Sequence, residues 1–282
     1  MKITGTTRIT GVMGYPVSHS LSPVFQNAAF VHAGLDYVYI PLEVAPENLE
    51  KAILSLRALN FRGVNLTIPH KKGAVKFLDE ISEDSRTLGV VNTVVNEKGI
   101  LKGDITDGRG FISSLSGDGK FSPAGKKVFL FGAGGSAYAI SGALVKAQIE
   151  SLYICNRTGE KALMLKKHLS GKFGFENIEP VPFDKRNDPG YWRDVHLLVN
   201  TTSLGMNEGG ENLVECSNLK RLQFVYDIVY NRSTELLEAA RRERVPCLGG
   251  LSMLVYQGAA SFEMWTGEKA PVDVMKRSLG WR

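Results

Sequence analysis

Six polar residues whose types could together bind and convert a small molecule stand at the ends of apolar segments. They comprise hydroxyls, an amide, an ammonium and a carboxylate: Ser20, Ser22, Thr67, Lys71, Asn92 and Asp107. Ligands of open α/β sheets bind at the carboxyl ends of strands, which is where these segments end. The set suits a polyhydroxylated carboxylate and needs no metal. Taken singly, each residue is more often a turn former or a helix cap, as for Ser22 and Asp107, so the hypothesis depends on their convergence.

A second group of residues is typical of a dinucleotide site. In VFLFGAGGSAYAI an apolar strand is followed by Gly132-x-Gly134-x-x-Ala137 and then by a helical pattern. The first glycine allows a tight turn, the second lets the backbone approach a pyrophosphate, and the alanine lets the helix pack closely. The alternative is a packing turn without a ligand. We expect the whole turn to bind the cofactor: Gly132, Ala133, Gly134, Gly135, Ser136 and Ala137.

The next strand of this region indicates which nucleotide is bound. An NAD site usually places Asp or Glu at that strand's tip, but SLYIC runs into Asn156, Arg157, Thr158 and, one turn later, Lys161. Arg157 and Lys161 suit a 2′-phosphate, and Thr158 can donate a hydrogen bond to it. A solvated basic helix start is the alternative, and Glu160 favours NAD. We predict NADP.

The bulk composition limits the class of protein. The chain has 282 residues, of which 43% are hydrophobic and 22% charged, with a formal net charge of +5. The basic residues are scattered, which disfavours nucleic-acid binding. The three cysteines have no CxxC spacing, and no two histidines have metal-ligand spacing, so we expect no disulfide framework and no metal. No signal peptide or apolar run of about 20 residues stands out, so we expect a cytoplasmic protein without a membrane span.

Strand-like and helix-like segments alternate along the chain, which predicts an α/β fold with mostly parallel sheets. Ser22 is expected to cap a first helix, 72–88 is expected to be helical, and a hairpin is expected to turn near Lys98-Gly99. The Gly/Pro/Ser-rich stretch at 116–127 precedes the strand of the dinucleotide motif. We predict a substrate domain at 1–106, to which 250–282 returns, and a Rossmann domain at 107–249.

The motifs together resemble the shikimate dehydrogenase family. They occur in the family's order between about residues 11 and 267: GYPVSHSLSP, NLTIPHKK, GVVNTV, TDGRGF, GAGGSA, NRT, NTTSLGM, YDIVYN and GGLSMLVYQGAASFEMWTG. The resemblance implies NADPH-dependent reduction of 3-dehydroshikimate to shikimate, on the pathway to chorismate and the aromatic amino acids. It also implies a small-molecule substrate, and we expect a monomer or homodimer.

The resemblance also implies roles for individual residues. Lys71 and Asp107 would be the catalytic pair, with Lys71 acting as general acid/base or as electrostatic stabiliser of the alkoxide. The carboxylate of the substrate would be held by Ser20, Ser22 and Tyr230. Its hydroxyls would contact Thr67, Asn92 and Gln257. The nicotinamide end of the cofactor would be lined by Thr201, Thr202, Ile228 and Gly250.

Departures from the family pattern leave two alternatives open. Gln26-Asn27 stands where His-Asn is usual and also occurs in the quinate/shikimate branch, Ile105 replaces an Asn, and Tyr138 replaces a basic residue. The first alternative is a quinate/shikimate dehydrogenase with mixed NAD/NADP use. The second is a regulator that senses shikimate without catalysis, which the presence of Lys71 and Asp107 disfavours.

Overall fold

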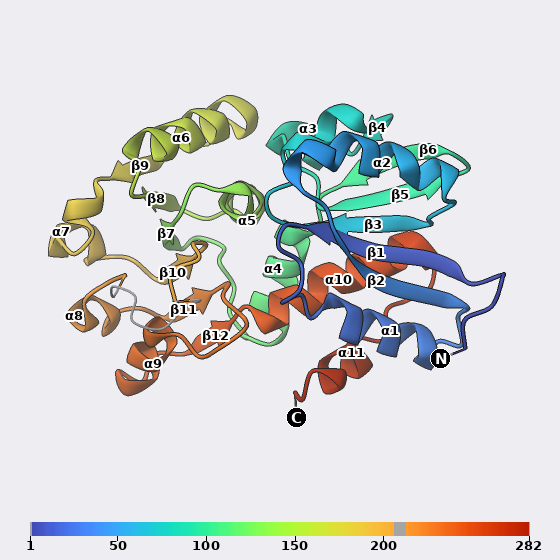
Figure 1. Cartoon of the computed structure of the whole chain (residues 1–282). Coiled ribbons are helices and arrows are strands. Elements are labelled where there is room, and N and C mark those ends of the chain that lie inside the picture. The colour runs from blue at the N-terminus through green and yellow to red at the C-terminus, as the bar shows by residue number, and fades with distance from the viewer. Residues whose placement is uncertain (1, 206–212, 282) are drawn as a thin grey trace. The chain divides into compact units, whose positions relative to one another are not determined.

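The computed structural model describes residues 2–205 and 213–281. The chain divides into two compact units, drawn in Figure 1: unit 1 comprises 1–110 and 255–282, and unit 2 comprises 111–254. The boundaries fall within helices α4 (Asp107–Gly117) and α10 (Leu251–Thr266). Within the described residues, each unit contains one six-stranded sheet.

The sheet of unit 1 is mixed and has the order β2-β1-β3-β5-β6-β4. Strand β1 pairs parallel with β2 and β3, whereas β5 runs antiparallel to β3 and β6. The predicted hairpin joins β5 to β6 through Lys98 and Gly99, which both have positive φ, as a tight hairpin turn requires. The strands are β1 (Arg8–Gly14), β2 (Tyr37–Glu43), β3 (Gly63–Leu66), β4 (Glu80–Ile81), β5 (Thr93–Glu97) and β6 (Ile100–Asp104).

Helices cover both faces of this sheet. On one face, the apolar residues of α2 (Leu49–Ala58) pack against Val64, Leu66 and Val94. On the other face lies α10, whose Trp265 contacts Tyr39 with ring centroids 5.8 Å apart. Figure 1 shows α1 (Ser22–His32) and α11 (Val272–Ser278) beside α10. Because side chains alternate along a strand, neighbouring residues of β3 and β5 face different helices.

The expectation of one helical stretch over 72–88 is wrong. A 3₁₀ turn (Gly73–Phe77) is followed by β4 and then by the short helix α3 (Glu83–Leu88). The carboxylate of Asp79 accepts the backbone N–H of Leu101 at 2.7 Å, which holds this segment beside the sheet. Ser82 then caps α3 by accepting the backbone N–H of Ser85 at 3.1 Å. The first contact joins segments far apart in sequence, and the second is a local helix cap. Both favour the broken segment over one continuous helix.

The expectation that Ser22 caps the first helix is also wrong. Leu21 occupies the cap position, no side chain caps the helix, and Ser22 is the first helical residue. The Ser22 side chain is instead buried beside Tyr39 of strand β2: burial raises the pKa of the Tyr39 phenol, and the nearby Ser22 hydroxyl acts in the other direction. The Ser22 side chain therefore packs against a neighbouring strand and does not provide the cap of its own helix that the sequence pattern predicts.

The sheet of unit 2 is entirely parallel, in the order β12-β11-β10-β7-β8-β9. If β7 to β12 are numbered 1 to 6, the order across the sheet, starting at β9, is 3-2-1-4-5-6. This is the doubly wound order of dinucleotide-binding sheets. The strands are β7 (Lys127–Phe131), β8 (Ser151–Cys155), β9 (Ile178–Val181), β10 (Leu197–Asn200), β11 (Phe224–Asp227) and β12 (Cys247–Gly249). The predicted α/β class with mostly parallel sheets and a Rossmann unit is confirmed.

Apolar side chains fill both faces of the second sheet. One core joins the sheet to α4, α5 and α6, and the other joins it to α7, α8 and α9. The remaining helices of unit 2 are α5 (Gly135–Lys146), α6 (Gly159–Phe173), α7 (Pro189–Trp192), α8 (Cys216–Leu219) and α9 (Glu235–Arg242). Two further short 3₁₀ turns complete the assignment, one in each unit, at Pro46–Asn48 and Phe183–Lys185.

Membrane-spanning helices and clusters of metal ligands are both absent from the described residues. None of the helices described is long and apolar enough to span a bilayer. No group of three or more His, Cys, Asp or Glu side chains in the described ranges is placed to hold a metal ion.

Candidate active site

Lys71 and Asp107, the predicted catalytic pair, meet in unit 1. The ammonium of Lys71 donates to Oδ2 of Asp107. Their side chains are 17% and 5% exposed, so the ion pair is shielded from bulk water but Lys71 retains access to it. Charges in such surroundings interact more strongly than surface charges do. The pair therefore presents a fixed ammonium to anything that enters from the exposed side of Lys71.

Asn92 is the third member of this cluster. Its Nδ2 donates to Oδ1 of Asp107 at 2.7 Å and to Oγ1 of Thr106 at 2.9 Å, and it lies 3.3 Å from Oε1 of Gln257. Both oxygens of Asp107 thus accept hydrogen bonds, one from Asn92 and one from Lys71. The structure brings together four of the predicted residues: Lys71, Asn92, Asp107 and Gln257.

The topology of the first sheet explains this convergence. Strand β3 ends at Leu66, shortly before Lys71, and β6 ends at Asp104, shortly before Asp107. Strand β5 runs the opposite way, so its beginning, next to Asn92, lies at the same edge of the sheet. The backbone N–H of Val91 donates to the carbonyl of Lys71 at 2.9 Å and ties the two segments together.

Three further predicted residues of unit 1, Ser20, Ser22 and Thr67, have other hydrogen-bond partners or local contacts. Ser20 is half-buried and its Oγ accepts the backbone N–H of Ser22 at 3.3 Å. Thr67 follows β3 and its carbonyl accepts the N–H of His70 at 2.8 Å. In the part of the chain that the structure describes, no side-chain hydrogen bond joins Ser20, Ser22 or Thr67 directly to Lys71, Asn92 or Asp107.

Sequence reasoning missed several buried polar residues behind the cluster. Thr106 is fully buried, and its N–H donates to Oδ1 of Asn92 at 2.8 Å. Behind Asn92 lie further buried side chains that are hydrogen-bonded to one another: Tyr39, Asn65, Thr93 and Ser261. The available signal was a polar residue inside an apolar strand, as in GVNL, because such a residue needs a buried partner.

In unit 2, the glycine-rich turn lies between β7 and α5. Gly132 has φ +108°, and a Cβ there would collide with Oγ1 of Thr201, so glycine is required. A Cβ at Gly134 would meet nothing within 4 Å, and Gly134 precedes α5 without any side-chain cap. Ala137 is fully buried. The turn thus leaves open space at the N-terminus of α5, where an anionic group is favoured.

The residues predicted to select the nucleotide follow β8. Arg157, Thr158 and Lys161 are exposed, and Asn156 is half-buried with its Nδ2 donating to the carbonyl of Thr158 at 2.9 Å. Thr158 is the N-cap position of α6, but its side chain makes no capping bond. The hydroxyl and the two cationic side chains are therefore accessible to a ligand.

The residues predicted to line the nicotinamide end are held by Asp227 and Asn200. Asn200 donates to Oδ1 of Asp227 at 2.9 Å and accepts the N–H and the hydroxyl of Thr202 at 2.9 and 2.7 Å. Thr201 donates to the carbonyl of Phe131 at 2.6 Å. Burial raises the pKa of Asp227 to about 6, although hydrogen bonds from Thr234, Val229 and Asn200 act in the other direction. Met206, the last residue of the NTTSLGM motif, lies outside the described residues.

Ile228, Tyr230 and Gly250 belong to the same unit. The N–H of Ile228 donates to the carbonyl of Asn200 at 3.0 Å. A Cβ at Gly250 would collide with the carbonyl oxygen of Ile228, so only glycine allows this close backbone approach. Tyr230 is half-buried, and burial raises its pKa.

Comparisons with known proteins identify the family. Models of the shikimate dehydrogenase substrate binding domain and the shikimate 5′-dehydrogenase C-terminal domain match residues 12–94 and 250–279. The shikimate dehydrogenase (NADP(+)) of Carboxydothermus hydrogenoformans is 42% identical over 283 residues, covering 99% of each chain. This chain belongs to the shikimate dehydrogenase family. The resemblance inferred from its motifs is confirmed.

Solved structures of family members match almost the full length of the chain. A shikimate dehydrogenase crystallised in complex with NADP+ is 37% identical, with a TM-score of 0.90 over 99% of this chain and 96% of that one. The shikimate 5-dehydrogenase of Thermus thermophilus, in complex with NADP(H) and shikimate, is 33% identical, with a TM-score of 0.85 over 96% of this chain and 98% of that one.

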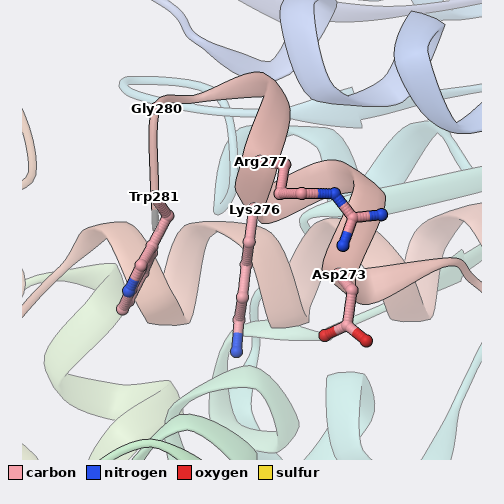
Figure 2. Close-up of a pocket in the computed structure, with 5 residues that line it drawn as sticks. All are labelled: Asp273, Lys276, Arg277, Gly280 and Trp281. Carbon is pink, nitrogen blue, oxygen red and sulfur yellow. The ribbon is translucent and has the colours of Figure 1, made fainter.

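A separate hollow lies on α11 at the C-terminal end of unit 1. Figure 2 shows Asp273, Lys276, Arg277 and Trp281 around it. The ammonium of Lys276 lies 4.6 Å from the ring centroid of Tyr256 on α10 and 5.3 Å from that of Trp281. These cation–π contacts attach the C-terminal residues to α10. None of the predicted site residues lines this hollow.

Proposed function

We propose that this protein is an NADP-dependent shikimate dehydrogenase, which catalyses the reversible reduction of 3-dehydroshikimate to shikimate in chorismate and aromatic amino acid biosynthesis. The observation that carries the proposal is the ion pair of Lys71 and Asp107 with Asn92 donating to the same carboxylate. This arrangement places the shielded ammonium of Lys71 beside hydrogen-bonding groups that can bind a substrate. The chain also belongs to the family whose members carry out this reaction.

The residues of unit 2 fit a dinucleotide phosphate. Open space next to Gly134 and the free N-terminus of α5 suit the pyrophosphate, and the exposed Arg157 and Lys161 suit a 2′-phosphate. When bound, NADPH supplies the hydride. The whole proposed cofactor set is Gly132, Ala133, Gly134, Gly135, Ser136, Ala137, Asn156, Arg157, Thr158, Lys161, Thr201, Thr202, Ile228 and Gly250.

The residues of unit 1 supply binding and charge. Thr67, Asn92 and Gln257 contact hydroxyl groups of the substrate, and Ser20 and Ser22 hold its carboxylate together with Tyr230. Reduction of the carbonyl makes an alkoxide, which Lys71 stabilises or protonates. Asp107 and Asn92 hold the ammonium in place, because Asp107 accepts from both.

The two predicted domains have corresponding roles. Residues 1–106 with 250–282 bind the substrate, and residues 107–249 bind the nucleotide. The compact units of the structure support this division, since they separate at 110 and 254. All three cysteines are free thiols, which supports a reducing, cytoplasmic location. A monomer or homodimer is proposed.

An assay with two substrates and two nucleotides tests the function. We expect shikimate with NADP+ to give the highest kcat/KM among the combinations of shikimate or quinate with NADP+ or NAD+. A preference for quinate with NAD+ would instead assign the chain to the quinate branch. Binding of shikimate without turnover with either nucleotide would favour a sensing role.

A further inference from the structure

A row of buried polar side chains crosses the face of the first sheet that α10 covers. Tyr39, Asn65 and Thr93 come from β2, β3 and β5, and Ser261 comes from α10; all are at most 6% exposed. Asn65 and Thr93 stand directly opposite each other in the β3–β5 register. Their neighbour Val94 belongs to the apolar core on the α2 side. The polar side chains of the row therefore share one face because side chains alternate along each strand, and that face is buried and not exposed to solvent.

The first hydrogen bond of the row has a fixed direction. The phenol of Tyr39 donates to Oδ1 of Asn65 at 2.7 Å, because an amide oxygen can only accept. The orientation of the Asn65 amide is fixed by the backbone carbonyl of Asn92, which can only accept and lies 3.1 Å from Nδ2. The hydroxyls of Ser261 and Thr93 lie 2.8 and 3.1 Å from the same Nδ2. Nδ2 carries two protons, which the carbonyl of Asn92 and the hydroxyls of Ser261 and Thr93 share.

The second step runs through Thr93. Its hydroxyl lies 3.0 Å from Oδ1 of Asn92 and 2.8 Å from the hydroxyl of Ser261. Since Oδ1 of Asn92 only accepts, the Thr93 proton must serve this bond. The single proton of Ser261 is shared between the hydroxyl of Thr93, at 2.8 Å, and the carbonyl of Gln257, at 3.1 Å. This arrangement gives every one of these buried atoms a partner, as buried polar groups require.

The last step reaches the ion pair. The backbone N–H of Thr106 donates to Oδ1 of Asn92 at 2.8 Å, which independently fixes the orientation of the Asn92 amide. Its Nδ2 therefore faces Oδ1 of Asp107, at 2.7 Å, while Oδ2 accepts from Lys71. The donors thus follow one direction from the phenol of Tyr39 to the carboxylate of Asp107.

We propose that Thr93 is a positioning residue for the reaction. Its hydroxyl holds the amide of Asn92 in the orientation that places Asp107, and through it Lys71, at the substrate. The phenol of Tyr39 and the amide of Asn65 precede Thr93 in the row, and they favour donation of the Thr93 proton to Asn92. The inference rests on the proposed function, because it concerns the same site.

Kinetics of Thr93→Val test the proposal, because valine keeps the shape and removes the hydroxyl. We expect kcat for shikimate oxidation to fall on the order of tenfold, and Thr93→Ser to restore most of it. The matched control is Thr10→Val: Thr10 is equally buried in the same sheet, but its hydroxyl bonds only the carbonyl of Val38 at 2.9 Å. Thr10→Val should lower stability and leave kcat unchanged, and equal kcat values in Thr93→Val and Thr10→Val would overturn the proposal.

A double-mutant cycle tests whether Thr93 acts through Asn92. In an Asn92→Ala background, Thr93→Val should change kcat less than about twofold, because the group it orients is gone. Full additivity of the two substitutions contradicts the proposal. Tyr39→Phe is the second variant should Thr93→Val not fold; it removes the phenol at the start of the row and should lower kcat in the same direction, whereas an unchanged kcat overturns the proposal.

A measurement without turnover separates this inference from the proposed function. In ¹⁵N-labelled protein, the side-chain amide signals of Asn92 should shift in Thr93→Val and remain in place in Thr10→Val. If wild-type protein shows no turnover, the proposed function fails, and this signal still decides the position of Asn92. Unshifted Asn92 signals in Thr93→Val would overturn the positioning role even in an active enzyme.

Discussion

Two adjacent lysines show how surroundings decide the role of a residue. Lys71 is mostly buried and paired with Asp107, whereas Lys72 is exposed. A lysine side chain is thus held by an ion pair at position 71 and is exposed to solvent at position 72. The proposed catalytic role requires an ammonium held at a defined place, as that of Lys71 is by Asp107.

Substitution of these lysines should therefore have unequal effects. We expect Lys71→Ala to lower kcat by roughly 10²–10⁴-fold and Lys72→Ala to change it less than about twofold. Lys71→Arg keeps the charge but not the compact ammonium, so it separates electrostatic stabilisation from proton transfer. Steady-state kinetics over a range of pH measure all three, and a near-normal kcat in both Lys71 variants would exclude the catalytic role.

Asp227 should make the stability of the protein depend on pH. Burial raises its pKa to about 6, above the value of 3.8 for an exposed carboxyl. The folded state thus holds the proton more tightly, so this contribution is complete below about pH 4 and is lost as the pH rises through 6. The difference is at most about 3 kcal/mol in the free energy of unfolding. Urea unfolding should show a smaller decline between pH 4 and 7 for Asp227→Asn than for wild type; parallel declines would refute this.

At the scale of elements, the β7–α5 turn contains two glycines with different functions. Gly132 has a backbone conformation and a close neighbour that only glycine tolerates, whereas Gly134 faces open space. One glycine serves the fold, and the other leaves room that the proposed pyrophosphate would use.

Alanine substitution should separate these two functions. Gly132→Ala should lower the free energy of unfolding by about 1–3 kcal/mol, because it strains the backbone beside Thr201. Gly134→Ala should leave the melting temperature unchanged and raise KM for NADP+, because its methyl group enters the open space. Thermal unfolding and cofactor titration measure both effects, and an unchanged KM in Gly134→Ala argues against phosphate binding there.

The junction of β8 and α6 should determine the preference for NADP+. Arg157→Ala should raise KM for NADP+ about tenfold or more and leave KM for NAD+ nearly unchanged, because only NADP+ carries the 2′-phosphate. Lys167→Ala, an exposed cation farther along α6, is the matched control for lost charge. If both variants raise the KM values equally, general charge and not a specific contact is responsible.

At the scale of the whole molecule, each unit has its own sheet and apolar cores, and the cysteines are distributed without a disulfide. Cys155 is buried in a core, Cys247 is half-buried, and Cys216 is exposed. Burial raises the pKa of Cys155 to about 12, which keeps it as an unreactive thiol.

Thiol titration should reflect this distribution. We expect a disulfide reagent to label Cys216 rapidly in the folded protein and all three thiols after unfolding. Mass spectrometry of the labelled peptides identifies each site. Fewer than three reactive thiols after unfolding would indicate a disulfide, and rapid labelling of Cys155 would indicate that the core opens.

Much of the fold could be predicted because its signals are local. Alternation of strand-like and helix-like segments identified the α/β class, and Lys98-Gly99 identified the hairpin through its turn chemistry. The segment 72–88 could not be predicted, because Asp79 takes its backbone partner, Leu101, on a strand remote in sequence. Ser22 failed as a cap for a similar reason, since its buried side chain lies beside Tyr39 of another element.

The sequence by itself determined the residue types at the site, the glycine turn, the likeness to a family and the general alternation of strands and helices, because these are properties of neighbouring residues. Only the tertiary structure decided which side chains share hydrogen bonds. Asn92 reaches Asp107 because β5 runs antiparallel between β3 and β6. Thr93 supports Asn92 because strand alternation turns it toward α10. Such contacts depend on register and direction across strands, which local propensity does not encode.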